Sequence, residues 1–278
     1  MIIGYLKETE SVVKAAIALK KEPGSTMVCG KNKRDLELKL SGYHGEVVQY
    51  AGDIVKNIPM NTRTVLWQKP PKFGRARCSI SAGLMIMYSL RHRSCKPDEL
   101  VKLISSYYPD IYAILSHKDE TSVTYHHMAM TVMAEYERMR AHSRFSVRGD
   151  LYYAEISPEH LVSDLYLEWS CRRLCDRPGI VKCHRDYYLV NANYLGYDRQ
   201  IKEISEDEVN RLLAGKEKAE NDIWEIFYDS QFIEGRRNKE HAKQMLPAKY
   251  TYLNDEIRKE RQKIERGIPR NTLNDFFS

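Results

Sequence analysis

Arginine is grouped at several places in this 278-residue sequence, and each group lies beside a segment predicted to be a helix or a strand. A guanidinium group binds phosphate through paired hydrogen bonds and stacks on nucleobases. Groups that converge in the fold would therefore form a nucleic-acid surface, whereas an isolated arginine near a helix end also stabilises the helix dipole. The predicted nucleic-acid-binding residues, with one neighbouring histidine, are Arg138, Arg140, Arg144, His160, Arg172, Arg173, Arg236 and Arg237.

A further basic feature is the loop at residues 69–77, which contains four basic residues and one aromatic residue. Lys72, Arg75 and Arg77 in this loop are predicted to contact a nucleic-acid backbone, because phosphate contacts dominate such binding. The alternative is an ordinary solvated loop.

Cysteine, histidine and carboxylate residues offer two weaker hypotheses. Cys171 and Cys175 are four residues apart and would share one face of a helix, so that with Cys183 and His184 they could bind zinc. A pair of helical cysteines is more often part of a core. Carboxylates near the arginine groups could instead hold magnesium in a nuclease. These carboxylates are Glu135, Glu137, Asp150 and Glu155. No resident cofactor is predicted.

Composition restricts the class of protein. Hydrophobic residues make up 42% of the sequence, which is enough to bury a core, and the net charge of +6 favours an anionic partner, with DNA or RNA the leading choice. No apolar run is long enough to cross a bilayer, so no membrane partner is expected, and the six cysteines have no dense disulfide spacing. We expect a cytoplasmic protein, or a nuclear one in a eukaryote. No P-loop, dinucleotide fingerprint or His-Glu-x-x-His motif indicates a specific enzyme class.

The C-terminal octet places three apolar residues on one turn of a helix. Leu273, Phe276 and Phe277 follow the i, i+3, i+4 spacing, and Pro269 separates them from the preceding helical pattern. A short apolar turn of this kind docks into hydrophobic grooves. The octet resembles the PCNA-interacting peptide, which attaches replication and repair proteins to a sliding clamp, with Arg270 where that motif usually has glutamine. The alternative is a tail that fills a gap in the protein's own core.

Residues 121–255 resemble an uncharacterised family described as DNA metabolism proteins. Three blocks carry the likeness: residues 135–145, residues 153–160 with 171–174, and residues 227–250. Members of that family are linked to radical SAM proteins and to proteins similar to uracil-DNA glycosylase, so the resemblance implies a role in DNA metabolism and possible partners of these two kinds. It implies no catalytic residue.

Apolar periodicity and turn residues predict the elements that position these groups. Predicted helices cover residues 8–21, 45–58, 79–90, 98–107, 121–142, 157–175, 205–213, 219–232 and 253–267. Predicted strands cover residues 26–29, 62–68, 144–147, 151–156, 180–183 and 187–191. The fold class that follows is α+β, helix-rich, with a small, mainly antiparallel sheet packed on helices.

The predicted organisation is a helix-rich N-terminal α/β region (1–118), a family-like α+β domain (119–252) and a charged helix with the clamp-binding-like tail (253–278). The leading function hypothesis is a DNA metabolism or repair factor that binds nucleic acid through its arginine groups and docks on a PCNA-type clamp through its tail. The alternatives are a nucleic-acid-processing enzyme, such as a nuclease or glycosylase-related protein, and an adaptor for a radical SAM or glycosylase partner.

Overall fold

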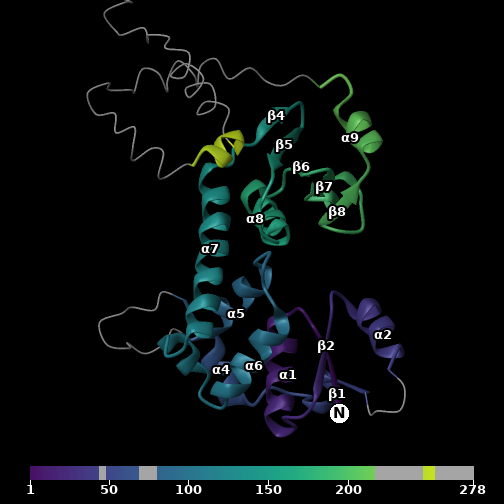
Figure 1. The fold of residues 1–278 in the computed structure, drawn as a ribbon. Helices are drawn as coiled ribbons and strands as arrows, with labels where there is room; N and C mark the ends of the chain where they lie inside the picture. The colour runs from purple at the N-terminus through teal and green to yellow at the C-terminus, as the bar shows by residue number, and fades with distance from the viewer. Residues whose placement is uncertain (44–47, 69–79, 217–246, 254–278) are drawn as a thin grey trace, which may run out of the picture. The chain divides into compact units, whose positions relative to one another are not determined.

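The computed structural model describes residues 1–43, 48–68, 80–216 and 247–253 (Figure 1). The chain divides into two compact units, Met1–Ala134 and Glu135–Ser278. The fold class is α+β and rich in helices, with small sheets packed on helices, as the sequence predicts. Among the described residues, no helix has both the length and the apolar composition needed to span a membrane.

The N-terminal unit is built on a parallel sheet of three strands in the order β2-β1-β3. The central strand is buried on both faces, since Ile2, Ile3 and Tyr5 are almost fully shielded from solvent. A strand of this kind lacks the alternation of apolar and polar residues that marks a half-exposed strand, and for this reason β1 was not predicted. The strands are β1 Ile2–Leu6, β2 Thr26–Gly30 and β3 Val48–Tyr50.

The helices of this unit follow the local signals in the sequence. Pro97 occupies the first turn of α6, with Asp98 and Glu99 beside it at the positive end of the helix dipole. The Ser81 hydroxyl accepts a hydrogen bond from the Leu84 amide and caps α5. The helices are α1 Thr9–Lys21, α2 Lys33–Ser41, α3 Ala51–Ile54, α4 Met60–Trp67, α5 Ala82–Arg91, α6 Pro97–Tyr107, the 3-10 turn η1 Ile111–Ser116 and α7 Glu120–His142, within which the division between the units falls.

Two predictions in this unit were wrong. Residues 62–67 of the predicted strand 62–68 belong to the helix α4, because Thr62 and Leu66, four residues apart, are buried on one helical face. The stretch 45–58 was predicted as one helix, but its described part contains β3 and the short α3. Here pairing with β1 overrides the local helical pattern, as tertiary contacts commonly do.

The C-terminal unit contains a five-stranded sheet in the order β4-β5-β6-β7-β8. The pairs are antiparallel except for β5 and β6, which are parallel and are joined by the helix α8. The strands predicted at 144–147 and 151–156 correspond to β4 and β5, which form a hairpin, and Gly149 supplies the positive φ that its tight turn needs. The elements are β4 Ser146–Arg148, β5 Leu151–Ile156, α8 Ser163–Leu174, β6 Gly179–Cys183, β7 Asp186–Val190, the turn η2 Ala192–Leu195, β8 Ile201–Ile204, α9 Glu206–Leu213 and the turn η4 Ala248–Leu253.

The two faces of this sheet are covered by different helices. Leu151, Ile180 and Leu189 point to one face and pack with Val209 of α9. Neighbouring residues in each strand point to the other face, where α8 lies. A side chain at Gly179 would come within 2.8 Å of Leu174 and 3.1 Å of the Tyr152 carbonyl oxygen. The end of α8 therefore lies directly over the start of β5 and β6.

The predicted helix at 157–175 begins six residues late, at Ser163. The Ser-Pro-Glu sequence at 157–159 is a helix start signal, but its backbone donates to groups elsewhere in the unit. The Ser157 amide donates to the Tyr252 hydroxyl, and the Glu159 amide donates to the Glu135 carboxylate. These tertiary hydrogen bonds hold the segment out of the helix. The predicted helix at 219–232 lies outside the described residues, and so does the predicted helix at 253–267 except for its first residue, Leu253.

Candidate functional site

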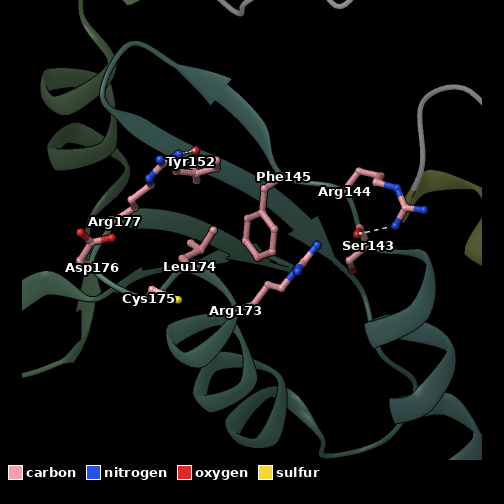
Figure 2. Close-up of a pocket in the computed structure, with 9 residues that line it drawn as sticks. All are labelled: Ser143, Arg144, Phe145, Tyr152, Arg173, Leu174, Cys175, Asp176 and Arg177. Atoms are coloured by element: carbon pink, nitrogen blue, oxygen red, sulfur yellow. Dashed lines mark hydrogen bonds between the residues drawn. The ribbon is translucent and has the colours of Figure 1, made fainter. Parts of the chain in front are cut away.

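A pocket of about 620 Å³ lies at the C-terminal end of α8 (Figure 2). It is formed by the segment that connects α7 to β4, by the start of β5, and by the end of α8 with the residues that follow it. Three of the side chains around it are arginines, two are aromatic and one is a carboxylate. The lining residues are Ser143, Arg144, Phe145, Tyr152, Arg173, Leu174, Cys175, Asp176 and Arg177.

The segment after α8 is held by a buried side chain from another part of the sheet. The Asn191 amide donates to the carbonyl oxygens of Cys171 (3.1 Å), Cys175 (2.9 Å) and Arg177 (3.1 Å). Its own carbonyl oxygen accepts a hydrogen bond of 3.2 Å from Gln200. These bonds satisfy carbonyl groups that a helix end leaves without partners. They also fix the backbone that carries Arg173 and Arg177.

Arg177 contacts the aromatic side chain of Tyr152 in the pocket lining. Its guanidinium group donates a hydrogen bond to the Tyr152 hydroxyl oxygen and lies 5.7 Å from the centre of the Tyr152 ring. The hydrogen bond raises the pKa of Arg177. Since arginine is charged at any physiological pH, the pocket has a permanent positive charge beside an aromatic face.

Arg144 and Phe145 enter the pocket from the segment after α7. The Arg144 guanidinium group donates to the carbonyl oxygens of Ser143 (3.1 Å) and Ala141 (3.3 Å), and it turns outward in Figure 2. The Phe145 ring packs against the Trp169 ring of α8, with 6.2 Å between the ring centres. Arg173 extends from the end of α8 toward Phe145 (Figure 2). The lining contains three arginines and one carboxylate, Asp176, so its net charge is positive and favours an anionic ligand with a flat apolar part.

A second cluster surrounds the buried carboxylate of Glu135, which is only 2% exposed. It accepts hydrogen bonds from the backbone amides of Glu159 and His160, each at 2.9 Å, and from the Tyr250 hydroxyl at 3.1 Å. Burial, and then the nearby Glu135 carboxylate, raise the pKa of Tyr250. We call Glu135 with these three donors the Glu135 cluster. Its members come from the three blocks of sequence that carry the family resemblance.

Basic side chains lie next to the Glu135 cluster. The Arg138 guanidinium group is 5.9 Å from the centre of the Tyr250 ring, and the Lys249 ammonium group forms a 2.7 Å ion pair with Glu159. The backbone amide of Arg144 donates to the Leu253 carbonyl oxygen at 3.1 Å. The turn η4 is therefore anchored beside the segment that lines the pocket.

Comparison with known families decides where the chain belongs. Residues 97–254, more than half of the chain, match a family model described as a domain of unknown function, DUF4130. The chain belongs to the DUF4130 family. The DUF4130 match covers the Glu135 cluster and the arginine pocket, and it begins at the first residue of α6, upstream of the predicted start at residue 121. No curated protein matches the chain.

The structure separates the predicted arginines into different groups. Arg144 and Arg173 line the pocket, and Arg138 and His160 belong to the surroundings of Glu135. Arg140 pairs with Glu137 at 2.9 Å, and Arg172 lies 4.0 Å from Glu168, so these two form ion pairs along their own helices. The predicted residues outside the described part of the chain are Lys72, Arg75, Arg77, Arg236, Arg237, Arg270, Leu273, Phe276 and Phe277.

Sequence reasoning missed Arg177, Tyr152 and Phe145. A usable signal was present for Arg177, which lies four residues after Arg173 and just before Pro178-Gly179, a pair of residues that ends helices. No signal pointed to Tyr152, because its contact with Arg177 depends on how β5 and α8 pack together.

The four residues of the zinc hypothesis are buried, hydrogen-bonded to other groups or exposed in the pocket. Cys171 and Cys183 are buried, and burial raises the pKa of both thiols. The ring nitrogens of His184 lie 2.9 Å from the Ser157 hydroxyl and 3.0 Å from the Pro158 carbonyl oxygen, and Cys175 is exposed in the pocket. Within residues 1–43, 48–68, 80–216 and 247–253, no group of three or more histidine, cysteine or acidic side chains is arranged to hold a metal ion.

Proposed function

We propose that this DUF4130 protein binds nucleic acid in DNA metabolism, and that it holds the ligand at the pocket formed by Arg144, Arg173 and Arg177. The observation that carries the proposal is the joint lining of one pocket by three arginines and two aromatic residues from separate segments of the sequence. Guanidinium groups suit phosphate oxygens, and aromatic rings suit bases. The net charge of +6 supports an anionic partner.

The choice of DNA metabolism depends on the family resemblance. That resemblance also supports a radical SAM protein or a protein similar to uracil-DNA glycosylase as a partner. RNA offers the same phosphate and base chemistry, so DNA and RNA strands of one sequence belong in every binding experiment.

We also propose that the tail delivers the protein to a PCNA-type clamp. Leu273, Phe276 and Phe277 have the spacing of a clamp-binding peptide, and Arg270 replaces the usual glutamine. This part of the proposal is supported by sequence alone and is tested separately from the pocket.

Paired substitutions test the pocket. Arg173→Ala and Arg177→Ala should each weaken binding of a labelled oligonucleotide by about tenfold, because a hydrogen bond to a charged group contributes roughly 1.5–3 kcal/mol. Each should also reduce the slope of log affinity against log salt by about 0.7–0.9 for every phosphate that the variant no longer neutralises. Fluorescence anisotropy from 50 to 200 mM salt measures both quantities.

Arg172→Ala is the matched control for this experiment. Arg172 precedes Arg173 on α8 but lies near Glu168 and does not line the pocket. Its removal subtracts the same charge and should cost clearly less affinity. If Arg172→Ala weakens binding as much as Arg173→Ala, the pocket is not the binding site. The enzyme alternatives stay predictions and are tested by incubating damaged and undamaged DNA with the protein, with and without divalent metal.

A further inference from the structure

The size of the pocket bears on which form of nucleic acid it accepts. Its volume of about 620 Å³ lies within the roughly 300–1,000 Å³ of pockets that enclose small ligands. A paired duplex presents its phosphates on a convex surface, and its bases are covered on both faces by their neighbours. A single nucleotide that is neither paired nor stacked can enter a pocket of this size with its base and phosphate together.

The aromatic side chains are available to such a base. Tyr152 and Phe145 are half-buried, so each is fixed by packing and keeps part of its ring in the pocket. Arg177 holds Tyr152 from the side of the α8 end, and Trp169 supports Phe145. Stacking on an aromatic side chain tolerates any base, because every base has a π-face.

The charged groups are placed for the phosphates next to that base. Arg173 and Arg177 are exposed on either side of the α8 end, four residues apart, and Arg144 comes from the segment after α7. The three hydrogen bonds from Asn191 fix the backbone between Arg173 and Arg177 in advance. A preformed site costs less ordering free energy on binding than a flexible one.

We propose that the pocket holds one unpaired nucleotide, so that the protein selects single-stranded or extrahelical nucleotides over paired duplex. This inference rests on the proposed function and names the substrate class of the same site. Base recognition comes from stacking on Phe145 and Tyr152, and backbone recognition comes from Arg173, Arg177 and Arg144.

The test compares three DNA ligands of one sequence with the full-length protein: a single strand, a blunt duplex, and a duplex with one bulged 2-aminopurine nucleotide. The single strand and the bulged duplex should bind at least tenfold more tightly than the blunt duplex. Stacking should quench the 2-aminopurine fluorescence of the bulge. Equal affinity for all three, with Arg173 still required, would overturn this inference and leave the proposed function standing. Absence of binding to any of them would overturn both.

Two variants separate stacking from folding. Phe145→Leu keeps an apolar side chain but removes the ring, and it should weaken binding of the single strand by roughly 5- to 150-fold, the range for one stacked base. Tyr194→Leu removes an exposed ring that does not line the pocket, so the preference for single strands should persist. If Phe145→Leu retains its circular dichroism spectrum and the full preference for single strands, stacking on Phe145 is excluded and the inference fails.

A measurement on the unmodified protein needs no variant. Cys175 is an exposed thiol in the pocket lining, whereas Cys29 and Cys95 are half-buried in the N-terminal unit. A saturating single strand should slow alkylation of Cys175 by iodoacetamide at least fivefold, as followed by peptide mass spectrometry. The same strand should leave Cys29 and Cys95 unchanged, and undiminished alkylation of Cys175 would place the strand elsewhere and overturn the inference.

Discussion

At the scale of the residue, the environment of Glu135 explains why three distant sequence blocks belong together. A carboxylate is rarely buried unless its oxygens accept hydrogen bonds. Here two backbone amides and one tyrosine hydroxyl satisfy it, and they come from the segment before α8 and from η4. One side chain of α7 thus fixes two segments that local sequence would not hold in place.

Glu135→Ala should destabilise the C-terminal unit by about 2–4 kcal/mol, because it leaves two amides and one hydroxyl without an acceptor in the interior. Urea unfolding followed by circular dichroism measures the loss. Glu137→Ala is the control, since Glu137 is two residues away, is 54% exposed and forms only a surface ion pair. That variant should stay within about 0.5 kcal/mol of the parent, and equal losses in the two variants would contradict this role of Glu135.

His126 of α7 gives the N-terminal unit a dependence on pH. Its ring lies 4.4 Å from the His117 ring, and burial, followed by the charge of His117, lowers the pKa of His126 below its ordinary value of 6.5. The unfolded chain therefore binds the proton at a higher pH than the folded chain does. The full stability is present above the ordinary pKa, and part of it is lost as the pH falls through the lowered pKa.

Hydrogen exchange of peptides from α5 and α7 at pH 7.5 and 5.5 checks this prediction, after correction for the intrinsic exchange rates. Protection should be lower at pH 5.5 in the parent, and the difference between the two pH values should shrink in His126→Gln. His127→Gln removes an exposed neighbour that makes the smallest of the three contributions to the lowered pKa of His126, so most of the parental difference should remain. A difference that survives in His126→Gln would assign the pH dependence to another group.

At the scale of the element, the end of α8 depends on a residue that is distant in sequence. Asn191 adopts a left-handed backbone conformation with φ of 55°, which asparagine tolerates better than most residues. From that position its amide donates to three carbonyl oxygens around the end of α8. The positions of Arg173 and Arg177 therefore depend on the end of β7, where Asn191 lies.

Asn191→Ala should cost about 2–4 kcal/mol of stability, since buried carbonyl groups lose their donor and the backbone conformation becomes less favourable. It should also weaken oligonucleotide binding, although Asn191 does not line the pocket. Asn193→Ala, an exposed site two residues on, should change neither quantity. Chemical denaturation and anisotropy on the same samples measure both, and normal binding by Asn191→Ala would show that the α8 end needs no such support.

The same dependence explains what sequence could and could not predict. Helix α9 was predictable because Ser205 caps it through the Glu208 amide, which is a local signal, and α6 because Pro97 marks its start. The predicted start of α8 at residue 157 was wrong. The segment 157–159 has a strong helix signal, but the Glu135 carboxylate accepts hydrogen bonds from the backbone amides of Glu159 and His160. Arg144 and Arg173 were predicted because they are grouped with other arginines beside predicted helices and strands, whereas their position near Tyr152 and Arg177 results from sheet packing.

At the scale of the whole molecule, the proposed function combines a ligand pocket in the C-terminal unit with a separate docking peptide. If the peptide binds a clamp, the pocket is brought to DNA at a high effective concentration without any additional interaction at the pocket itself. The two parts should then be separable by mutation.

Phe276→Ala combined with Phe277→Ala should abolish binding to a PCNA-type clamp in titration calorimetry and leave oligonucleotide binding and stability unchanged. Arg270→Gln, which restores the residue usual in that motif, should strengthen clamp binding. Clamp affinity that is unchanged in the double alanine variant would refute docking through the tail, and the pocket variants Arg173→Ala and Arg177→Ala should bind the clamp normally.

The anchoring of η4 also determines where the chain can be cut or tagged. Tyr250 and Tyr252 in this turn donate to Glu135 and accept from Ser157, so a truncation after residue 246 would remove a donor to an interior carboxylate. The truncated protein would lose both stability and the tail. A loss of clamp binding could then result from either change. A cut, a protease site or a fluorescent fusion placed after Leu253 preserves these hydrogen bonds, and a cut there removes only residues 254–278, which include the tail.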